Sequence, residues 1–466
     1  MNILRSLLLL LVIPISGFGQ APDSIVLSPD QFMELVRQYH PISIQADLQL
    51  KKGQAVLLQA KGNFDPKIST DIQQKYFDDK QYYSLIDAGI KIPTWPGIDI
   101  KAGFSQSDGS FLNPENSLPS NGLVYGGISI PVGQGLLMDA RRAALQQAKI
   151  YQEATAAERQ LMLNKLFYEA GYAYWNWFVA FHQLDIHTTA LRLAEDRLQA
   201  VKEYAIYGDR PFIDTLEAGI QVQNRQIDFQ NARLEMQQKK LELENFLWIS
   251  DIPLTLEETT TPISRKELDQ IDFLTDLAAV VPDSIILNHP YLEVAKLEIE
   301  QQEVELRWKK EQLKPILNIQ YQPLLEVVSG TETAAFNPAN YKWGLEFSMP
   351  VFLRKERGAI ALSELKIQES TQKLRYQNQL LANSALAAKQ SWLNLQDQQY
   401  LYERNARDYG LLLEGERALF QQGESSLFLV NNRESKWISA QIKLLETYGK
   451  VQQAIISYQY ALGTLN

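Results

Sequence analysis

Four histidines are the side chains of this sequence best suited to bind a metal or transfer a proton, because the chain contains no cysteine. His40 and His289 each precede a proline at the expected start of a helix, so we expect them to mark helix boundaries. His182 and His187 are five residues apart, which is a poor chelating spacing on a helix. No HExxH, GxxxxGKS/T, GxSxG or GxGxxG motif occurs. We therefore predict no catalytic residue, no metal and no cofactor, and we do not expect an enzyme.

A pair of acidic residues follows a glycine in the first half of the chain. Asp214 and Glu217 lie six and nine residues after Gly208, and their spacing of three places both carboxylates on one face of a helix. Acidic residues are also common at helix starts, where they complement the helix dipole. A purely structural role for the pair therefore remains open.

The composition excludes several classes of protein. The 466 residues carry a net charge of −10, with 45% hydrophobic and 21% charged residues. Binding to nucleic acid needs a basic surface for the phosphates, so we expect no nucleic-acid partner. The hydrophobic content is too high for a disordered chain.

The first 19 residues resemble an export signal. Arg5 precedes an apolar stretch that begins at Leu7 and ends at Ile15, and the small residues Gly17 and Gly19 follow it. This order is typical of a cleaved signal peptide. A membrane anchor is the alternative, but the apolar stretch is shorter than the ~20 residues that a spanning helix needs.

The chain contains the same pattern twice. His40-Pro41 recurs as His289-Pro290, and Pro66 and Pro315 show the same separation. Glycines at Gly208 and Gly423 follow later in each copy. Landmarks in the same order indicate an internal duplication. We expect a signal peptide at 1–19, a first helix–strand–strand–helix repeat at 20–250, a linker at 251–288 and a second repeat at 289–466.

Each repeat contains segments in which apolar and polar residues alternate. In the second repeat Tyr341, Trp343 and Leu345 alternate with Lys342 and Gly344. Such alternation predicts two strands per repeat with one apolar and one polar face, although a soluble sandwich would show it too. The first repeat has additional, proline-rich residues between its two strand segments, which form either a surface loop or an additional hairpin.

Very long helices should follow the strands. Proline is absent between Pro131 and Pro211 and after Pro350, which predicts helices of roughly 65 residues, about 100 Å long at 1.5 Å per residue. Each should reach a glycine-containing turn and return as a shorter helix. Apolar residues recur at coiled-coil spacing in these stretches. The predicted seams are Leu191, Ala194, Leu198, Val201 and Ala205; Ile220, Ile227, Leu234 and Leu241; and Tyr402, Ala406, Tyr409 and Leu413.

Strands of this kind suit an outer-membrane barrel, but four cannot close one, because the smallest membrane barrels have about eight. Open edges in lipid would leave backbone groups unpaired, at a cost of several kcal/mol each. Several copies must therefore share one barrel, and three copies with four strands each would give twelve. The fold class expected is helix-dominated and internally duplicated, with membrane β-strands and long helical hairpins.

This plan resembles the TolC family of trimeric outer-membrane efflux channels over essentially the whole mature chain. The local matches are the His-Pro starts, the glycine-bearing tips and the C-terminal residues from Ala461 to Asn466. The resemblance implies a homotrimer in the outer membrane of a Gram-negative bacterium, with a shared twelve-stranded barrel continued by a helical tunnel into the periplasm. It further implies that a periplasmic adaptor protein and an inner-membrane pump are partners and that the channel itself is passive.

The resemblance also suggests functional residues. The family carries acidic constriction residues six and nine positions after the glycine of the second tip, where this chain has Leu429 and Asn432. Asp214 and Glu217 hold the corresponding places after the first tip, where three copies would form a ring that favours cations. The tips resemble the adaptor-docking turns of the family. They comprise Tyr207, Gly208, Asp209 and Arg210 in the first repeat, and Gln422, Gly423, Glu424 and Ser425 in the second.

A different class of protein remains open. An exported coiled-coil protein, such as a trimeric adhesin or a periplasmic adaptor, would also contain long helices. An adaptor would carry a single hairpin flanked by compact β-domains, and an adhesin would carry one stalk with one anchor. Neither predicts two matched sets of strands.

Overall fold

The computed structural model describes residues 25–208, 211–268, 289–327 and 334–465. The predicted signal peptide, Asp209, Arg210 and most of the predicted linker lie outside the described residues. The chain forms two compact units. The sheet unit comprises the described residues of Ile42–Lys165, Val281–Ala387 and Gln459–Asn466; the helical unit comprises those of Met1–Pro41, Leu166–Val280 and Ala388–Tyr458.

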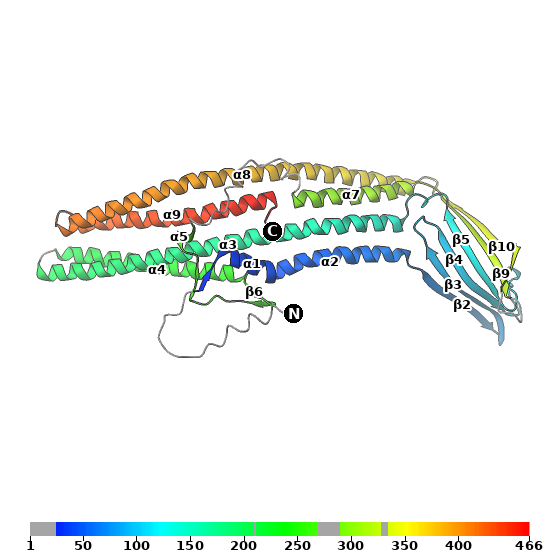
Figure 1. Ribbon diagram of the computed structural model, residues 1–466. Coiled ribbons are helices and arrows are strands. Elements are labelled where there is room, and N and C mark those ends of the chain that lie inside the picture. Colours follow the sequence, from blue (N-terminus) through cyan, green and yellow to red (C-terminus); the bar gives the residue numbers. More distant parts are fainter. Residues whose placement is uncertain (1–24, 209–210, 269–288, 328–333, 466) are drawn as a thin grey trace. The chain divides into compact units, whose positions relative to one another are not determined.

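A six-stranded antiparallel sheet dominates the sheet unit (Figure 1). Its strand order is β10-β9-β5-β4-β3-β2, so each strand pairs with the strands that precede and follow it among these six. The strands are β2 (Lys67–Phe77), β3 (Lys80–Pro93), β4 (Asp99–Asp108), β5 (Leu123–Pro131), β9 (Ile316–Val327) and β10 (Ala334–Ser348).

The additional residues of the first repeat form β3 and β4, which lie between β2 and β5 in the sheet. Of the two alternatives for the insertion, the structure shows the additional hairpin, so the described sheet has six strands and not the four per chain of a twelve-stranded trimeric barrel. The reason is that this insertion alternates in the same way as its neighbours. Ile90 pairs with both Ile68 and Ala102, so the apolar residues of the insertion continue one face of the sheet.

The register gives the sheet two chemically different faces. Successive side chains of a strand point to opposite faces, and paired residues share a face. One face carries Ile68, Ile72, Ile86, Ile90, Ile100, Phe104, Val124, Ile128, Ile319, Tyr321, Tyr341, Trp343, Leu345 and Phe347. The other carries Lys67, Ser69, Asp71, Gln73, Asp87, Lys91, Lys101, Ser105, Ser129, Asn318, Gln320, Gln322, Lys342 and Glu346.

Helices adjoin the sheet in each repeat. They are α2 (Pro41–Lys61), α7 (Pro290–Glu311) and the first parts of α3 (Ala140–Tyr207) and α8 (Arg354–Gln421); short 3-10 turns lie at η1 (Gly62–Phe64) and η2 (Pro114–Asn116). Small side chains allow close helix packing, as in the cluster of Ala60, Leu145 and Ala148.

The helical unit consists mainly of two hairpins. The second parts of α3 and α8 return as α4 (Phe212–Glu244) and α9 (Leu427–Leu462). With 68 residues each for α3 and α8, and 33 and 36 for α4 and α9, the predicted helix lengths are confirmed. The remaining elements are β1 (Ile25–Leu27), α1 (Pro29–Tyr39), β6 (Trp248–Ile249), β7 (Ile252–Pro253), β8 (Thr260–Pro262) and α5 (Arg265–Leu268).

An aromatic cluster forms part of the core of this unit. Phe32 of α1 and Tyr174, Trp177 and Phe178 of α3 are all fully buried. The Tyr174 hydroxyl donates a hydrogen bond of 2.8 Å to the Leu27 carbonyl, which joins β1 to α3. This burial raises the pKa of Tyr174.

The predicted seams have different outcomes. Ala194, Val201, Ala406 and Leu413 are buried as predicted. The predicted seam of α4 is 50–63% exposed in the described chain, so it does not form part of the core of the described chain. Instead α4 buries a parallel stripe two positions earlier, which contains Ala218, Arg225 and Ala232; the exposed stripe comprises Ile220, Ile227, Leu234 and Leu241.

Candidate functional site

Glycines form the turns at the two helical tips. Gly208 and Gly423 have φ angles of +80° and +81°, in the left-handed region that glycine adopts without strain. At the second tip the Gly423 amide donates to the Phe420 carbonyl (3.1 Å) and the Glu424 amide to the Leu419 carbonyl (2.9 Å). These two bonds form a Schellman motif, which ends α8.

Most of the predicted docking residues that the structure describes are exposed. Tyr207 is the last residue of α3 and is 80% exposed. Gln422, Gly423 and Glu424 are exposed as well. Ser425 is half-buried, and its hydroxyl donates to Glu416.

Asp214 and Glu217 lie near the start of α4, and both are half-buried. The Glu217 carboxylate accepts a hydrogen bond of 3.3 Å from the Asn431 side chain of α9. It also lines an open groove of about 690 Å³ between α4 and α9, together with Asn432 and Lys436. The structure thus ties Glu217 to the second hairpin of the same chain.

A buried carboxylate that the sequence reasoning missed lies near Glu217. Glu434 of α9 is fully buried, and it accepts hydrogen bonds from the guanidinium groups of Arg197 and Arg417. Arg197 also donates to the Asn431 side chain at 2.8 Å. The polar chain from Glu217 to Arg417 therefore joins α3, α4, α8 and α9.

The sequence contains a signal for this network. Val430, Glu434 and Ile438 are spaced by four, and Val430 and Ile438 are buried. An acidic residue at the middle of such a stripe must be buried with its apolar neighbours, and a buried charge needs a partner. The partner Arg197 is more than 200 residues away in sequence, and only the structure identifies it.

An apolar cluster accompanies the network. Val201 of α3, Ala218 of α4 and Leu427 of α9 are buried together, and Phe420 of α8 packs against them. The two hairpins are thus joined both by packing and by charge.

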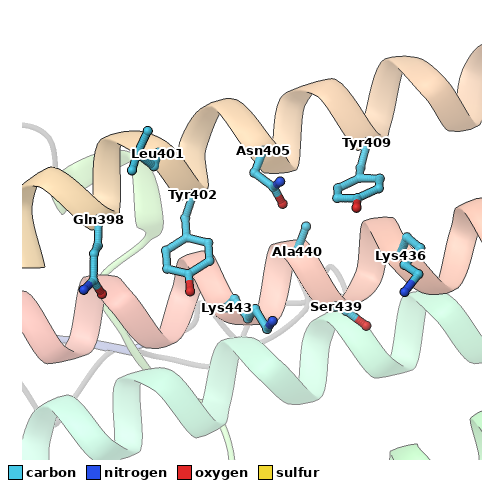
Figure 2. Close-up of a pocket in the computed structure, with 9 residues that line it drawn as sticks. All are labelled: Gln398, Leu401, Tyr402, Asn405, Tyr409, Lys436, Ser439, Ala440 and Lys443. Carbon is cyan, nitrogen blue, oxygen red and sulfur yellow. The ribbon is translucent and has the colours of Figure 1, made fainter.

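A second groove, of about 730 Å³, lies between α8 and α9 (Figure 2). Tyr402 and Tyr409 point from α8 toward α9, where Lys436 and Lys443 lie opposite (Figure 2). Both tyrosines are positions of the predicted seam, so they face the returning helix as expected. The groove is a gap along this hairpin, with polar groups from both helices.

The polar face of the sheet has its own hydrogen bonds. Asp87 accepts from the Ser105 hydroxyl at 2.6 Å and from the Tyr125 hydroxyl at 3.1 Å. The Tyr125 ring lies over Gly89 and Gly103, where an added Cβ atom would lie 2.8 and 2.4 Å from the Tyr125 hydroxyl oxygen. The two glycines therefore make room for the ring.

An ionic cluster lies where the sheet meets α3. Asp99 binds Lys91 at 2.8 Å and Arg141 at 2.9 Å, and Arg141 also binds Asp139 at 3.0 Å. Burial alone would raise the pKa of Asp139, but hydrogen bonds from Arg142 and Arg141 lower it below its ordinary value. The cluster fixes the start of β4 to the start of α3.

The histidines have structural positions. His289 is the N-cap of α7, and its Nδ1 accepts from the Tyr291 amide at 3.1 Å, which confirms the predicted boundary role. His40 ends α1 and stacks on Phe246 at 5.7 Å. Burial lowers the pKa of all four histidines. Among the described residues, no group of three or more histidine, aspartate or glutamate side chains is placed to hold a metal ion.

Within the described part of the chain, every helix is too short or too polar to cross a membrane.

Comparison with known proteins identifies solved structures that share this fold. The family model described as outer membrane efflux protein matches residues 281–464. A comparison with the curated proteins found no match. The solved structures include the open state of the Neisseria gonorrhoeae MtrE outer membrane channel, which has a TM-score of 0.69 and 15% sequence identity over 97% of this chain and 94% of that chain.

Two further structures show the same fold. A membrane protein from Pseudomonas aeruginosa matches with a TM-score of 0.66 and 14% identity over 96% of this chain and 99% of its own. The Campylobacter jejuni CmeC outer membrane channel matches with a TM-score of 0.65 and 12% identity, over 98% and 94% respectively. The family-model match over residues 281–464 and the shared fold confirm the resemblance to outer-membrane efflux channels.

Proposed function

We propose that copies of this chain assemble in the outer membrane of a Gram-negative bacterium into a channel that passively conducts substrates from the periplasm to the exterior. The observation that carries this proposal is the six-stranded sheet with one apolar and one polar face. An apolar face suits contact with lipid, and a polar face suits a water-filled interior.

The sheet cannot serve in lipid as a single copy. β2 and β10 are the two ends of its strand order, and each has a backbone edge without a neighbour in the described sheet. Unpaired backbone groups in lipid cost several kcal/mol each, so the edges must pair with other copies. Twelve strands in a trimer would need four from each chain. With six from each, a homotrimer would share a barrel of eighteen, within the range of 8–26 strands that single-chain outer-membrane barrels show.

The helical unit supports the same assembly. The exposed stripe of α4 has isoleucine or leucine at every seventh residue from Ile220 to Leu241, and each of these side chains is at least half exposed. A heptad stripe of this kind packs well against another helix. We assign it to contact with a neighbouring copy, so that the helices form a tunnel in the periplasm.

The exposed tips are the proposed docking site for a periplasmic adaptor protein, which would link the channel to an inner-membrane pump. Turns held by left-handed glycines present a fixed backbone. Energy would come from the pump. Asp214 and Glu217 form the proposed constriction behind the first tip, where three copies would favour cations.

Fractionation and native mass measurement test the assembly. A trimer that dissociates on heating, found in the outer membrane, supports the proposal. A monomer in the soluble fraction contradicts it, and a trimer in the soluble periplasmic fraction would favour the structural coiled-coil alternative.

Conductance tests the constriction. The purified protein in planar bilayers should conduct, and Asp214→Asn with Glu217→Gln should reduce its preference for cations. The matched control is Asp228→Asn, which changes one carboxylate further along α4 that already binds Arg225 at 3.3 Å. Equal selectivity in the parent and in the double variant would remove the constriction assignment.

A further inference from the structure

A row of lysines crosses the polar face of the sheet. Lys67 of β2 pairs with Lys91 of β3, and Lys91 pairs in turn with Lys101 of β4. Lysine side chains on three consecutive strands therefore lie directly beside one another.

The same row continues to the far edge of the sheet. Lys101 pairs with Gly127 of β5, and a Cβ atom at Gly127 would lie 2.4 Å from the Gln322 side chain of β9. Gln322 pairs with Lys342 of β10. Four of the six strands thus place a lysine at one level, and the other two place a glycine and a neutral amide there.

This arrangement costs the sheet stability, because like charges directly opposite each other on neighbouring strands repel. Lys91 has a partner in Asp99 at 2.8 Å. Lys67, Lys101 and Lys342 form no ion pair with any residue that the structure describes.

The other carboxylates of this face lie at a distance from the row. Asp71 lies four residues along β2 from Lys67, about 14 Å at 3.4 Å per residue, which exceeds the Debye length of about 10 Å at 0.1 M salt. Asp87 and Glu346 lie four residues along their strands from Lys91 and Lys342, and Glu326 lies four residues along β9 from Gln322, so each is about as far from the row as Asp71 is. The row is therefore a band of positive charge.

We propose that this row forms an anion-binding ring inside the barrel and that the channel passes anionic small molecules such as carboxylates and phosphates. The inference rests on the proposed function, which makes the polar face the lining of the pore. A trimer would hold twelve lysines at this level, nine of them without an ion-pair partner. Rings of basic side chains attract anions and repel cations in pores.

The proposed acidic constriction acts in the opposite sense, so the sign of the overall selectivity does not test the ring. The test is the change in selectivity when only the lysines change. It is made both in the parent and in the Asp214→Asn/Glu217→Gln background.

The experiment measures the reversal potential of the purified assembly in planar bilayers under a gradient of potassium chloride around 0.1 M. In Lys67→Gln/Lys101→Gln/Lys342→Gln we expect the chloride-to-potassium permeability ratio to fall roughly threefold, because three charges per copy leave the wall. The difference should shrink at 1 M salt, where the Debye length is about 3 Å. The matched control replaces the same three lysines with arginine, which keeps the charge and should keep the ratio.

A second measurement needs no variant. Inorganic triphosphate added to one side should reduce the conductance of the parent in 0.1 M potassium chloride, because a multivalent anion binds the ring more tightly than chloride does. A ratio that is unchanged in the glutamine variant, or a conductance that triphosphate does not alter, would overturn the ring while leaving the channel intact. A parent that does not conduct at all would instead overturn the proposed function.

Discussion

Glu434→Gln tests the charge network that joins the two helical hairpins. The substitution keeps the shape of the side chain and removes its negative charge. Arg197 and Arg417 would then share a site without the carboxylate that both contact. The charged side chains would remain close together while their compensating charge is lost.

The exposure of the partners sets the size of the effect. The Glu434 side chain is 0% exposed and that of Arg197 is 14% exposed, so water does little to replace the lost interaction there. Removal of one partner of a buried ion pair costs about 3–5 kcal/mol. Arg417 is 37% exposed, and Arg197 keeps its bond to Asn431, so we expect the low end of that range, about 3 kcal/mol.

Thermal unfolding of the purified assembly, followed by near-ultraviolet circular dichroism, measures this effect. We expect the midpoint to fall by roughly 5 °C. The control is Glu364→Gln, because the Lys310–Glu364 pair is about half exposed on both sides and should change stability by less than about 0.5 kcal/mol. A double variant, Arg197→Met/Glu434→Leu, should lose less than the sum of its single changes. If Glu434→Gln is no more destabilising than Glu364→Gln, the reasoning about this network is refuted.

Three further predictions concern stability. Gly103→Ala should destabilise the protein by about 1–3 kcal/mol, because the new Cβ would lie 2.4 Å from the Tyr125 hydroxyl oxygen. The control is Gly126→Ala in the same sheet, which meets nothing within 4 Å and should be neutral or slightly stabilising. Thermal midpoints compare the two variants, and equal losses would contradict the crowding argument. Gly423→Ala forces a left-handed φ of +81° on a residue with a Cβ and should cost about 1–2 kcal/mol, seen as faster hydrogen exchange at the second tip. Lowering the pH from 7.5 to 5.5 should destabilise the protein. The histidines of the unfolded chain bind protons near their ordinary pKa of about 6.5, whereas burial lowers the pKa of the same histidines in the folded state. At one pH unit below 6.5 the loss is up to about 1.4 kcal/mol per histidine. Thermal midpoints at the two pH values measure this loss, and a higher midpoint at pH 5.5 would contradict the prediction. The histidines concerned are His40, His182, His187 and His289.

The sequence predicted the elements of this fold well because their signals are local. Long stretches without proline predicted α3 and α8, and Gly208 and Gly423 predicted the turns that follow them. Alternation along β10 predicted its two faces. Each of these features depends on residues that are neighbours along the chain.

The sequence left open whether the insertion adds strands, and it did not identify the buried face of α4. The prolines of the insertion, from Pro93 to Pro119, were compatible with a loop, yet its segments pair as β3 and β4. The seven-residue repeat at Ile220 and Ile227 marked an apolar stripe, but the same helix has a second stripe that contains Ala218, Arg225 and Ala232, and that one is buried. Periodicity identifies apolar faces and does not identify their partners.

The sequence by itself determined the long helices, the strands outside the first-repeat insertion, the glycine turns and the family that the chain resembles. Only the tertiary structure decided that Glu434 lies between Arg197 and Arg417, and that lysines from four strands share one level of the sheet. These contacts join residues far apart along the chain, and they depend on strand register and helix rotation. A shift of one residue in register would move every side chain of a strand to the opposite face, so the packing of the whole sheet, and not any local pattern, sets which charges meet.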